Sequence, residues 1–162
     1  AFSIGSGPQA SISGFLLFLT GVAIMAPIGP LPGFFIHGTP TKVPASWPDT
    51  SDEHKILLQV DGVLPRVVII WVVDYENDLY VFGGTTSGWV QLIGESAPVK
   101  MRLDNSTFDL IAERVTDDLA AITTAYRDKY RADYPEIIES GDLDVNKANE
   151  SFRVFRLERP ST

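Results

Sequence analysis

The chain has 162 residues, with 13 basic and 21 acidic side chains, a formal net charge of −8 and no cysteine. An acidic chain without a basic cluster has no face that could follow a phosphate backbone, so nucleic acid is excluded as a partner. Without cysteine, disulfides and thiol nucleophiles are excluded as well. The length allows one folded domain of roughly 110 residues beside an apolar segment.

Charge is absent from the first 41 residues, and all charged side chains follow them, beginning with Lys42. Within this part, residues 12–28 approach the ~17–25 apolar residues that a helix needs to cross a bilayer. A secretory signal peptide would need a basic residue before the run, and none is present. A buried core helix would need more packing partners than the remaining chain supplies. We therefore predict an N-terminal tail and a single transmembrane helix within residues 1–36. Its expected contacts with lipid or with a partner helix are Gly14, Phe15, Phe18 and Gly21.

Prolines dominate the next stretch, and residues 37–53 are expected to form a stiff, extended linker. Phe34, Phe35 and Trp47 follow the apolar run. Aromatic side chains just outside a membrane span often lie at the level of the lipid headgroups. These three residues are therefore predicted to contact the membrane or a partner there.

The orientation in the membrane follows from the nearest basic residues. Lys42 and Lys55 lie on the C-terminal side of the apolar run, and no basic residue lies before it. The positive-inside rule then predicts a single-pass membrane protein with its N-terminus outside and its folded head in the cytoplasm.

Strand patterns begin after the linker, in the predicted head domain of residues 54–162. Residues 55–60 are expected to form the first strand, and residues 99–103 alternate between apolar and polar side chains, the pattern of a half-buried strand. Residues 66–73 form an uninterrupted apolar run, which predicts a strand buried on both faces. Further strands are expected at residues 78–82, 107–115 and 151–157.

One main helix is expected between the last two strands. Thr116 is predicted to cap it, with Asp117 and Asp118 in its first turn, and Pro135 is predicted to end it. Antiparallel hairpins followed by a helix and a returning strand predict an α+β fold, a small antiparallel barrel crossed by the helix.

Several short segments, in their order and spacing, resemble a known family. They resemble the FMN- or deazaflavin-binding split β-barrel proteins, the group that is pyridoxamine-phosphate-oxidase-like and nitroreductase-like. The resemblance covers about residues 55–157 and implies a split-barrel head with a flavin as cofactor. The segments that carry it are LPRVVIIWVV (64–73), DLYV (78–81), SGWV (87–90), PV (98–99) and YRDKY (126–130).

The resemblance also implies where a flavin would bind. Arg66 would hold the phosphate, because a phosphate needs a cationic, hydrogen-bonding partner. Thr85, Thr86 and Ser87 would donate hydrogen bonds to the phosphate or the ring, and Trp89 would stack on the ring.

The chain departs from the family pattern in the turn before Arg66. That turn usually carries several basic residues, whereas residues 61–65 read DGVLP and bring an acidic side chain instead. A carboxylate there repels a phosphate. We therefore expect a degenerate member of the family that has lost its cofactor, with FMN or deazaflavin binding as the alternative.

Other chemistry has little support in the sequence. Asp49, Asp52, Glu53 and His54 include metal-ligand types, but the solvated end of a linker explains them more simply. No catalytic residue and no metal ligand is predicted.

Two functions remain open. The favoured one is a non-catalytic, single-span accessory subunit that docks on and stabilises a larger membrane protein complex, such as a respiratory or photosynthetic one. The alternative is a membrane-anchored flavin- or deazaflavin-dependent oxidoreductase that acts on a hydrophobic or quinone-like substrate.

Overall fold

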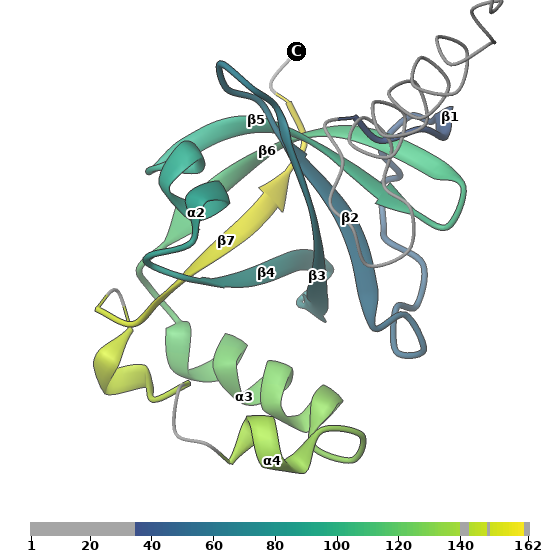
Figure 1. Cartoon of the computed structure of the whole chain (residues 1–162). Helices are drawn as coiled ribbons and strands as arrows, with labels where there is room; N and C mark the ends of the chain where they lie inside the picture. Colours follow the sequence, from purple (N-terminus) through teal and green to yellow (C-terminus); the bar gives the residue numbers. More distant parts are fainter. Residues whose placement is uncertain (1–34, 140–142, 149, 161–162) are drawn as a thin grey trace, which may run out of the picture.

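The computed structural model describes residues 35–139, 143–148 and 150–160, and most of their strands form a closed barrel (Figure 1). In chain order the strands are β1 (Thr39–Pro40), β2 (Lys55–Val60), β3 (Arg66–Tyr75), β4 (Asp78–Gly84), β5 (Ser96–Leu103), β6 (Ser106–Val115) and β7 (Phe152–Glu158). Neighbouring strands of the barrel pair antiparallel in the order β5-β2-β3-β4-β7-β6, and pairing of β5 with β6 closes it. The short β1 pairs with β6 in parallel. The predicted α+β fold with a small antiparallel barrel is thus confirmed.

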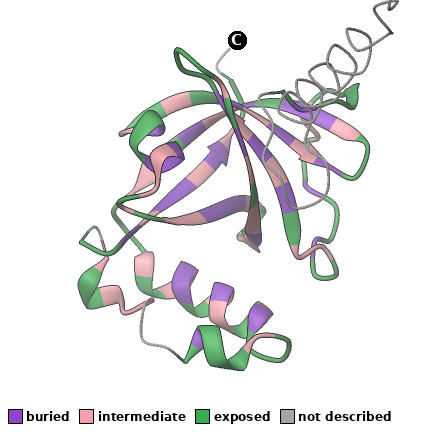
Figure 2. Ribbon diagram, viewed as in Figure 1, coloured by how far each residue is buried: buried purple, intermediate pink, exposed green. Residues whose placement is uncertain are grey.

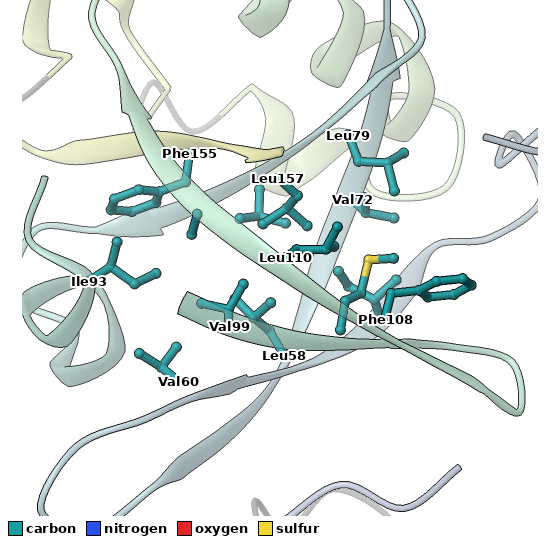
Figure 3. Packing of buried hydrophobic residues seen from close by; sticks show 14 of the residues in the cluster. Leu58, Val60, Val72, Leu79, Ile93, Val99, Phe108, Leu110, Phe155 and Leu157 are labelled. Carbon is teal, nitrogen blue, oxygen red and sulfur yellow. The ribbon is translucent and has the colours of Figure 1, made fainter. Parts of the chain in front are cut away.

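Alternating apolar side chains fill the barrel interior. In β2 the inward positions Leu58 and Val60 are fully buried, and Met101, the β5 partner of Leu58, is buried too. Figure 3 shows Leu58, Val60, Leu110 and other apolar side chains meeting in the space between the strands. The interior is therefore a packed hydrocarbon core, whose burial is the main stabilising contribution to such a domain.

The strand β3 is covered on both faces near its C-terminal end. Val72 points into the barrel core, while Val73 belongs to a second apolar cluster under the helix α3 (Leu119–Tyr130). The prediction of a strand buried on both faces is right for this end of β3, whereas Ile69, closer to its start, remains 38% exposed. The short helices α4 (Pro135–Ile138) and η1 (Val145–Lys147) follow α3.

The start of α3 differs from the expectation. Thr116 does not cap the helix; the residue before its first turn is Asp118, which has a left-handed φ of 53° and makes no capping hydrogen bond with its side chain. Asp117 and Asp118 thus lie before the helix and not in its first turn. The chain needs a sharp bend there, because β6 must end and α3 must cross the outside of the barrel (Figure 1).

A helix that the sequence analysis did not predict, α2 (Gly88–Ile93), connects β4 to β5. It buries Trp89, Val90 and Ile93 against the barrel core. The Trp89 ring lies so close to the backbone of Gly83 that a Cβ atom added there would be 2.2 Å from it. Gly83 is therefore required for close packing between α2 and β4.

The segment expected to be a linker is packed along the barrel instead. Trp47 is 7% exposed and meets Phe108 edge to face, with ring centroids 5.2 Å apart. The Arg159 guanidinium donates hydrogen bonds to the carbonyls of Pro44 and Ala45. The prediction that Trp47 lies at a membrane interface is wrong, because its indole is part of the barrel core.

The predicted transmembrane run, residues 12–28, lies outside the described residues, as do its contact residues Gly14, Phe15, Phe18 and Gly21, and also Phe34. In the part of the chain that is described, no helix has the length and hydropathy to cross a membrane. Phe35, the first described residue, is 46% exposed.

The close packing at Gly83 generates a prediction. Gly83→Ala should lower the free energy of unfolding by about 1–3 kcal/mol, because the added methyl group overpacks the contact with Trp89 and Val90. Gly84→Ala is the matched control, since its nearest neighbour would be 3.6 Å away, and it should change stability by less than about 0.5 kcal/mol. Urea denaturation measures both variants, and equal effects would contradict the packing role of Gly83.

Candidate functional site

The structure brings part of the predicted flavin site together at one end of the barrel. Arg66 begins β3, and its guanidinium lies against Gly88, the first residue of α2. A Cβ atom on Gly88 would be only 2.1 Å from a guanidinium nitrogen. Arg66 and the segment that contains Ser87 are thus neighbours, although they are about 20 residues apart in the sequence.

The three hydroxyl residues before α2 have different surroundings. The Thr85 hydroxyl donates to the carbonyl of Glu150 at 2.9 Å, and its backbone N–H donates to the carbonyl of Ser151. Ser87 precedes the first turn of α2 without a capping bond from its side chain, and Thr86 is exposed. The Thr85 hydroxyl therefore holds the loop before β7 in place, and its proton is not available to a ligand.

Trp89 is only 6% exposed. Its ring packs on Gly83 and lies 5.8 Å from the ring of Phe155. A ring that stacks on a flavin needs an open face, and both contacts of Trp89 are to the barrel. Its role in this structure is to anchor α2.

These residues do not fit a flavin. Arg66 is the one cation of the implied set, and the turn before it carries Asp61 and two exposed apolar side chains, Val63 and Leu64. The Thr85 hydroxyl and the Trp89 ring, which would hold the phosphate or the ring, are used by the fold. Among the implied residues, a phosphate would meet one guanidinium, that of Arg66.

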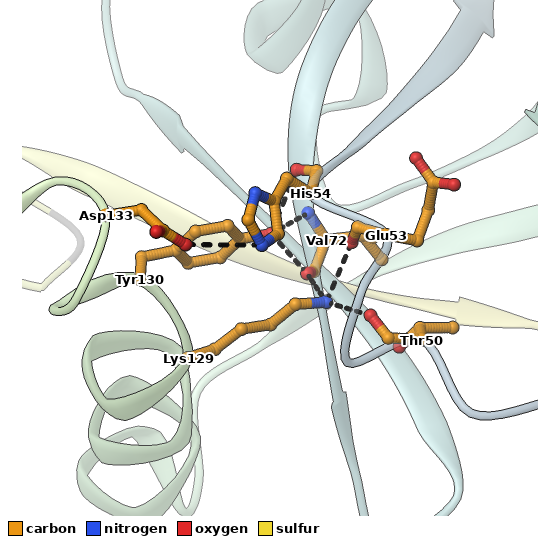
Figure 4. A network of polar contacts seen from close by, with 7 residues as sticks. All are labelled: Thr50, Glu53, His54, Val72, Lys129, Tyr130 and Asp133. Carbon is orange, nitrogen blue, oxygen red and sulfur yellow. Dashed lines mark hydrogen bonds and ion pairs between the residues drawn. The ribbon is translucent and has the colours of Figure 1, made fainter.

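A polar network lies at the other end of β3, where α3 crosses the barrel (Figure 4). The ladder between β2 and β3 ends at the pair of Lys55 with Trp71. The next residues, His54 and Val72, are bridged by the Tyr130 hydroxyl, which accepts from the Val72 N–H at 3.0 Å. The hydroxyl oxygen lies 2.6 Å from the carbonyl of Val72 and 3.0 Å from that of His54, and donates its proton between them.

The neighbouring residue, Lys129, completes this network. Its ammonium donates to the carbonyls of Thr50, Glu53 and Val72 at 2.6, 2.9 and 2.9 Å. Burial lowers the pKa of Lys129, while nearby carboxylates, first that of Glu53, oppose this effect. All three protons of the ammonium have acceptors, so Lys129 stabilises the fold and is not placed as a nucleophile.

The polar cluster before β2 does not form a metal site. His54 makes an ion-pair contact with Asp133, with Nε2 3.5 Å from the carboxylate. In residues 35–139, 143–148 and 150–160, no three His, Asp or Glu side chains gather as metal ligands. In this segment the backbone carbonyls of Thr50 and Glu53 accept hydrogen bonds from Lys129, and that of His54 accepts one from Tyr130.

A cleft of about 510 Å³ lies between the β3–β4 turn, the end of β6 and the start of α3. Its lining is strongly acidic, and the neighbouring Glu76 raises the pKa of the Tyr75 hydroxyl. A negative potential of this kind repels phosphates and carboxylates. Among the lining residues are Glu76, Asp78, Glu113, Asp117 and Asp118, together with Arg114 and Arg156.

The bridge made by Tyr130 generates a prediction. Tyr130→Phe should lower the free energy of unfolding by about 1–3 kcal/mol, because it leaves the buried Val72 N–H without its acceptor. Tyr134→Phe is the matched control: Tyr134 also packs on Trp71, and its hydroxyl makes no hydrogen bond within the described residues. Urea denaturation of both variants should separate them, and an unchanged Tyr130→Phe would show that the bridge contributes nothing.

Burial also generates a prediction about alkaline pH. It raises the pKa of Tyr126 and of Tyr130 well above 10.0. The folded state therefore keeps protons that the unfolded chain loses, so stability should fall as pH rises above about 10, by up to about 1.4 kcal/mol per pH unit for each tyrosine. Tyr126→Phe should reduce this slope, as measured by urea denaturation between pH 9 and 11. A slope equal to that of the parent chain would contradict the assignment.

Comparison with known proteins gives the following likenesses. No curated protein matches the sequence. HutZ, the heme storage protein from Vibrio cholerae, matches with a TM-score of 0.48 and 16% identity over 69% of this chain and 86% of HutZ. A protein described as general stress protein 26, from Jannaschia sp. CCS1, has a TM-score of 0.49 and 11% identity over 67% of each chain. A nimC/nimA family protein from Clostridium acetobutylicum has a TM-score of 0.41 and 18% identity over 64% of this chain and 71% of its own.

With identities below 20% and TM-scores below 0.5, these likenesses say nothing about what this chain binds. A family assignment comes from the sequence itself. Residues 49–145, more than half of the chain, match one family over the strands β2 to β6 and the helix α3. The chain therefore belongs to the family described as "Uncharacterized protein conserved in bacteria (DUF2255)".

Proposed function

We propose that this chain is a non-catalytic accessory subunit, held in a membrane by one helix at residues 12–28, whose barrel docks on a larger membrane complex. The observation that carries the proposal is the distribution of charge. None of the 34 charged side chains lies in the first 41 residues, although they make up about a fifth of the whole chain. A segment of this kind is compatible with the hydrocarbon of a bilayer.

The way in which this segment joins the barrel supports the proposal. The backbone N–H of Ile36 donates to the Gln59 side chain at 3.0 Å, and Thr39 and Pro40 pair with β6. Further along, Trp47 is buried in the barrel core. These three contacts limit how far the barrel can move relative to the N-terminal segment. A restricted orientation suits a subunit that presents a fixed surface to a neighbouring protein.

The barrel itself also supports a role without chemistry. Lys129 has all three of its protons donated to carbonyls, and the Thr85 hydroxyl and the Trp89 ring are used in packing and loop attachment. Arg66, beside Gly88, is the one feature that favours the alternative, a membrane-anchored flavin or deazaflavin oxidoreductase. One cation is a weak basis for binding a phosphate.

The proposal is tested by extracting the full chain from its native membrane in mild detergent and measuring its native mass and absorbance. We expect a mass well above 17.8 kDa plus detergent, made up of this chain and other subunits, and no flavin absorbance in proportion to this chain. A chain that migrates alone and carries one flavin per copy would overturn the proposal in favour of the oxidoreductase. Loss of that absorbance in Arg66→Ala would then identify the phosphate contact.

A further inference from the structure

An exposed apolar surface lies at the turn between β2 and β3. Val63 is fully exposed, Leu64 is 69% exposed and Leu92, on α2, is 42% exposed. Gly62 joins them, because a Cβ atom on it would lie 3.1 Å from the Leu92 side chain. We call Val63, Leu64 and Leu92 the apolar tip. Figure 2 shows this turn, at the top of the view, in the colour of exposed residues.

In this turn Asp61, Gly62 and Pro65 are typical turn residues, whereas Val63 and Leu64 are not. Turns in water are usually built from Gly, Pro, Asn, Asp and Ser, which satisfy the backbone or adopt its special angles. The side chains of Val63 and Leu64 cannot form hydrogen bonds with the backbone and do not favour special backbone angles. Their exposure shows that they contribute little to the barrel core. Clustered exposed apolar side chains commonly mark a contact with another apolar surface.

The uncharged N-terminal part of the chain reaches the barrel beside this tip. Ile36 is bound through its N–H to Gln59, which lies near the end of β2. The Gln59 side chain in turn donates to Asp61, the first residue of the turn, at 3.2 Å. The exposed Phe35 precedes Ile36. Figure 1 places this turn at the end of the barrel away from α3 and α4.

Chain length limits how far this end can be from a bilayer. If residues 12–28 cross it, seven residues, 29–35, separate the span from Ile36. Fully extended, they reach at most about 25 Å. The end of the barrel that carries Gln59 is therefore held near the membrane surface, and the turn begins two residues later.

We propose that the apolar tip inserts into the interface of the bilayer that holds the N-terminal segment. This inference rests on the membrane anchoring in the proposed function. The tip then places Val63, Leu64 and Leu92 in an apolar environment, and fixes the barrel with α3, α4 and the acidic cleft directed away from the lipid.

The charges of the chain indicate what kind of membrane contact this is. The net charge of −8 gives the head no general attraction to anionic lipid. Next to the tip, Asp61 and Arg66 carry opposite charges. Insertion therefore depends on apolar burial, and should take place on zwitterionic lipid and change little with salt.

The test uses the full chain, which lacks cysteine, so that one introduced cysteine labels one position. Val63→Cys, labelled with an environment-sensitive fluorophore, is reconstituted into phosphatidylcholine vesicles that contain a nitroxide-labelled lipid. Ile137→Cys on α4 is the matched control, because Ile137 is an apolar side chain with 48% exposure at the far end of the molecule. We expect the nitroxide to quench at least half of the fluorescence at position 63 and less than a tenth of it at position 137.

The outcomes separate the two proposals. A chain that does not float with the vesicles overturns the membrane anchor and this inference with it. A chain that floats, but whose label at position 63 is quenched no more than at 137, keeps the anchor and overturns the inference. A label that is blue-shifted without being quenched is covered by protein, either a partner or a second copy, and also overturns it. Leu64→Asp should lower the quenching of a label at Leu92→Cys at least twofold, whereas Ile137→Asp should not change it.

Discussion

Two adjacent side chains of α3, Lys129 and Tyr130, complete the hydrogen bonding of the barrel where β2 and β3 stop pairing. Beyond the pair of Lys55 with Trp71, the buried N–H of Val72 and the partly buried carbonyl of His54 both bond to the Tyr130 hydroxyl. An unpaired buried N–H would be costly in a protein interior. The Lys129 ammonium also donates hydrogen bonds to the carbonyls of Thr50 and Glu53, in the segment before β2. This arrangement attaches α3 to the barrel and holds residues 50–54 in place at the same time.

Two of the residues predicted to bind a flavin, Thr85 and Trp89, make contacts within the barrel instead. At the end of β4, Gly83 is needed so that Trp89 can lie directly on its backbone. The Thr85 hydroxyl ties the end of this strand to the loop before β7. Val63 and Leu64 are exposed apolar residues of the barrel, and they lie beside the attachment of the uncharged N-terminal part.

The sequence was most informative where the pattern is local. Alternation in β5 and the apolar run of β3 predicted these strands, because burial in a barrel follows the period of the strand. Two of the three tryptophans were harder to place: Trp47 follows a proline-rich stretch and Trp89 follows a glycine-rich one, yet both are in the core. Their burial depends on contacts with Phe108 and Phe155, far away in the chain. The helix α2 has six residues, too few for a helical period to show.

We propose that residues 12–28 cross a membrane while the barrel stays at its surface. Amide hydrogen exchange of the full chain in lipid nanodiscs tests it most directly. If hydrocarbon surrounds residues 12–28 and excludes water, their amides should exchange over hours or more slowly, whereas those of the exposed turn at Asp104 and Asn105 should exchange within seconds. Exchange of residues 12–28 as fast as that of the turn would show that this segment does not cross the membrane.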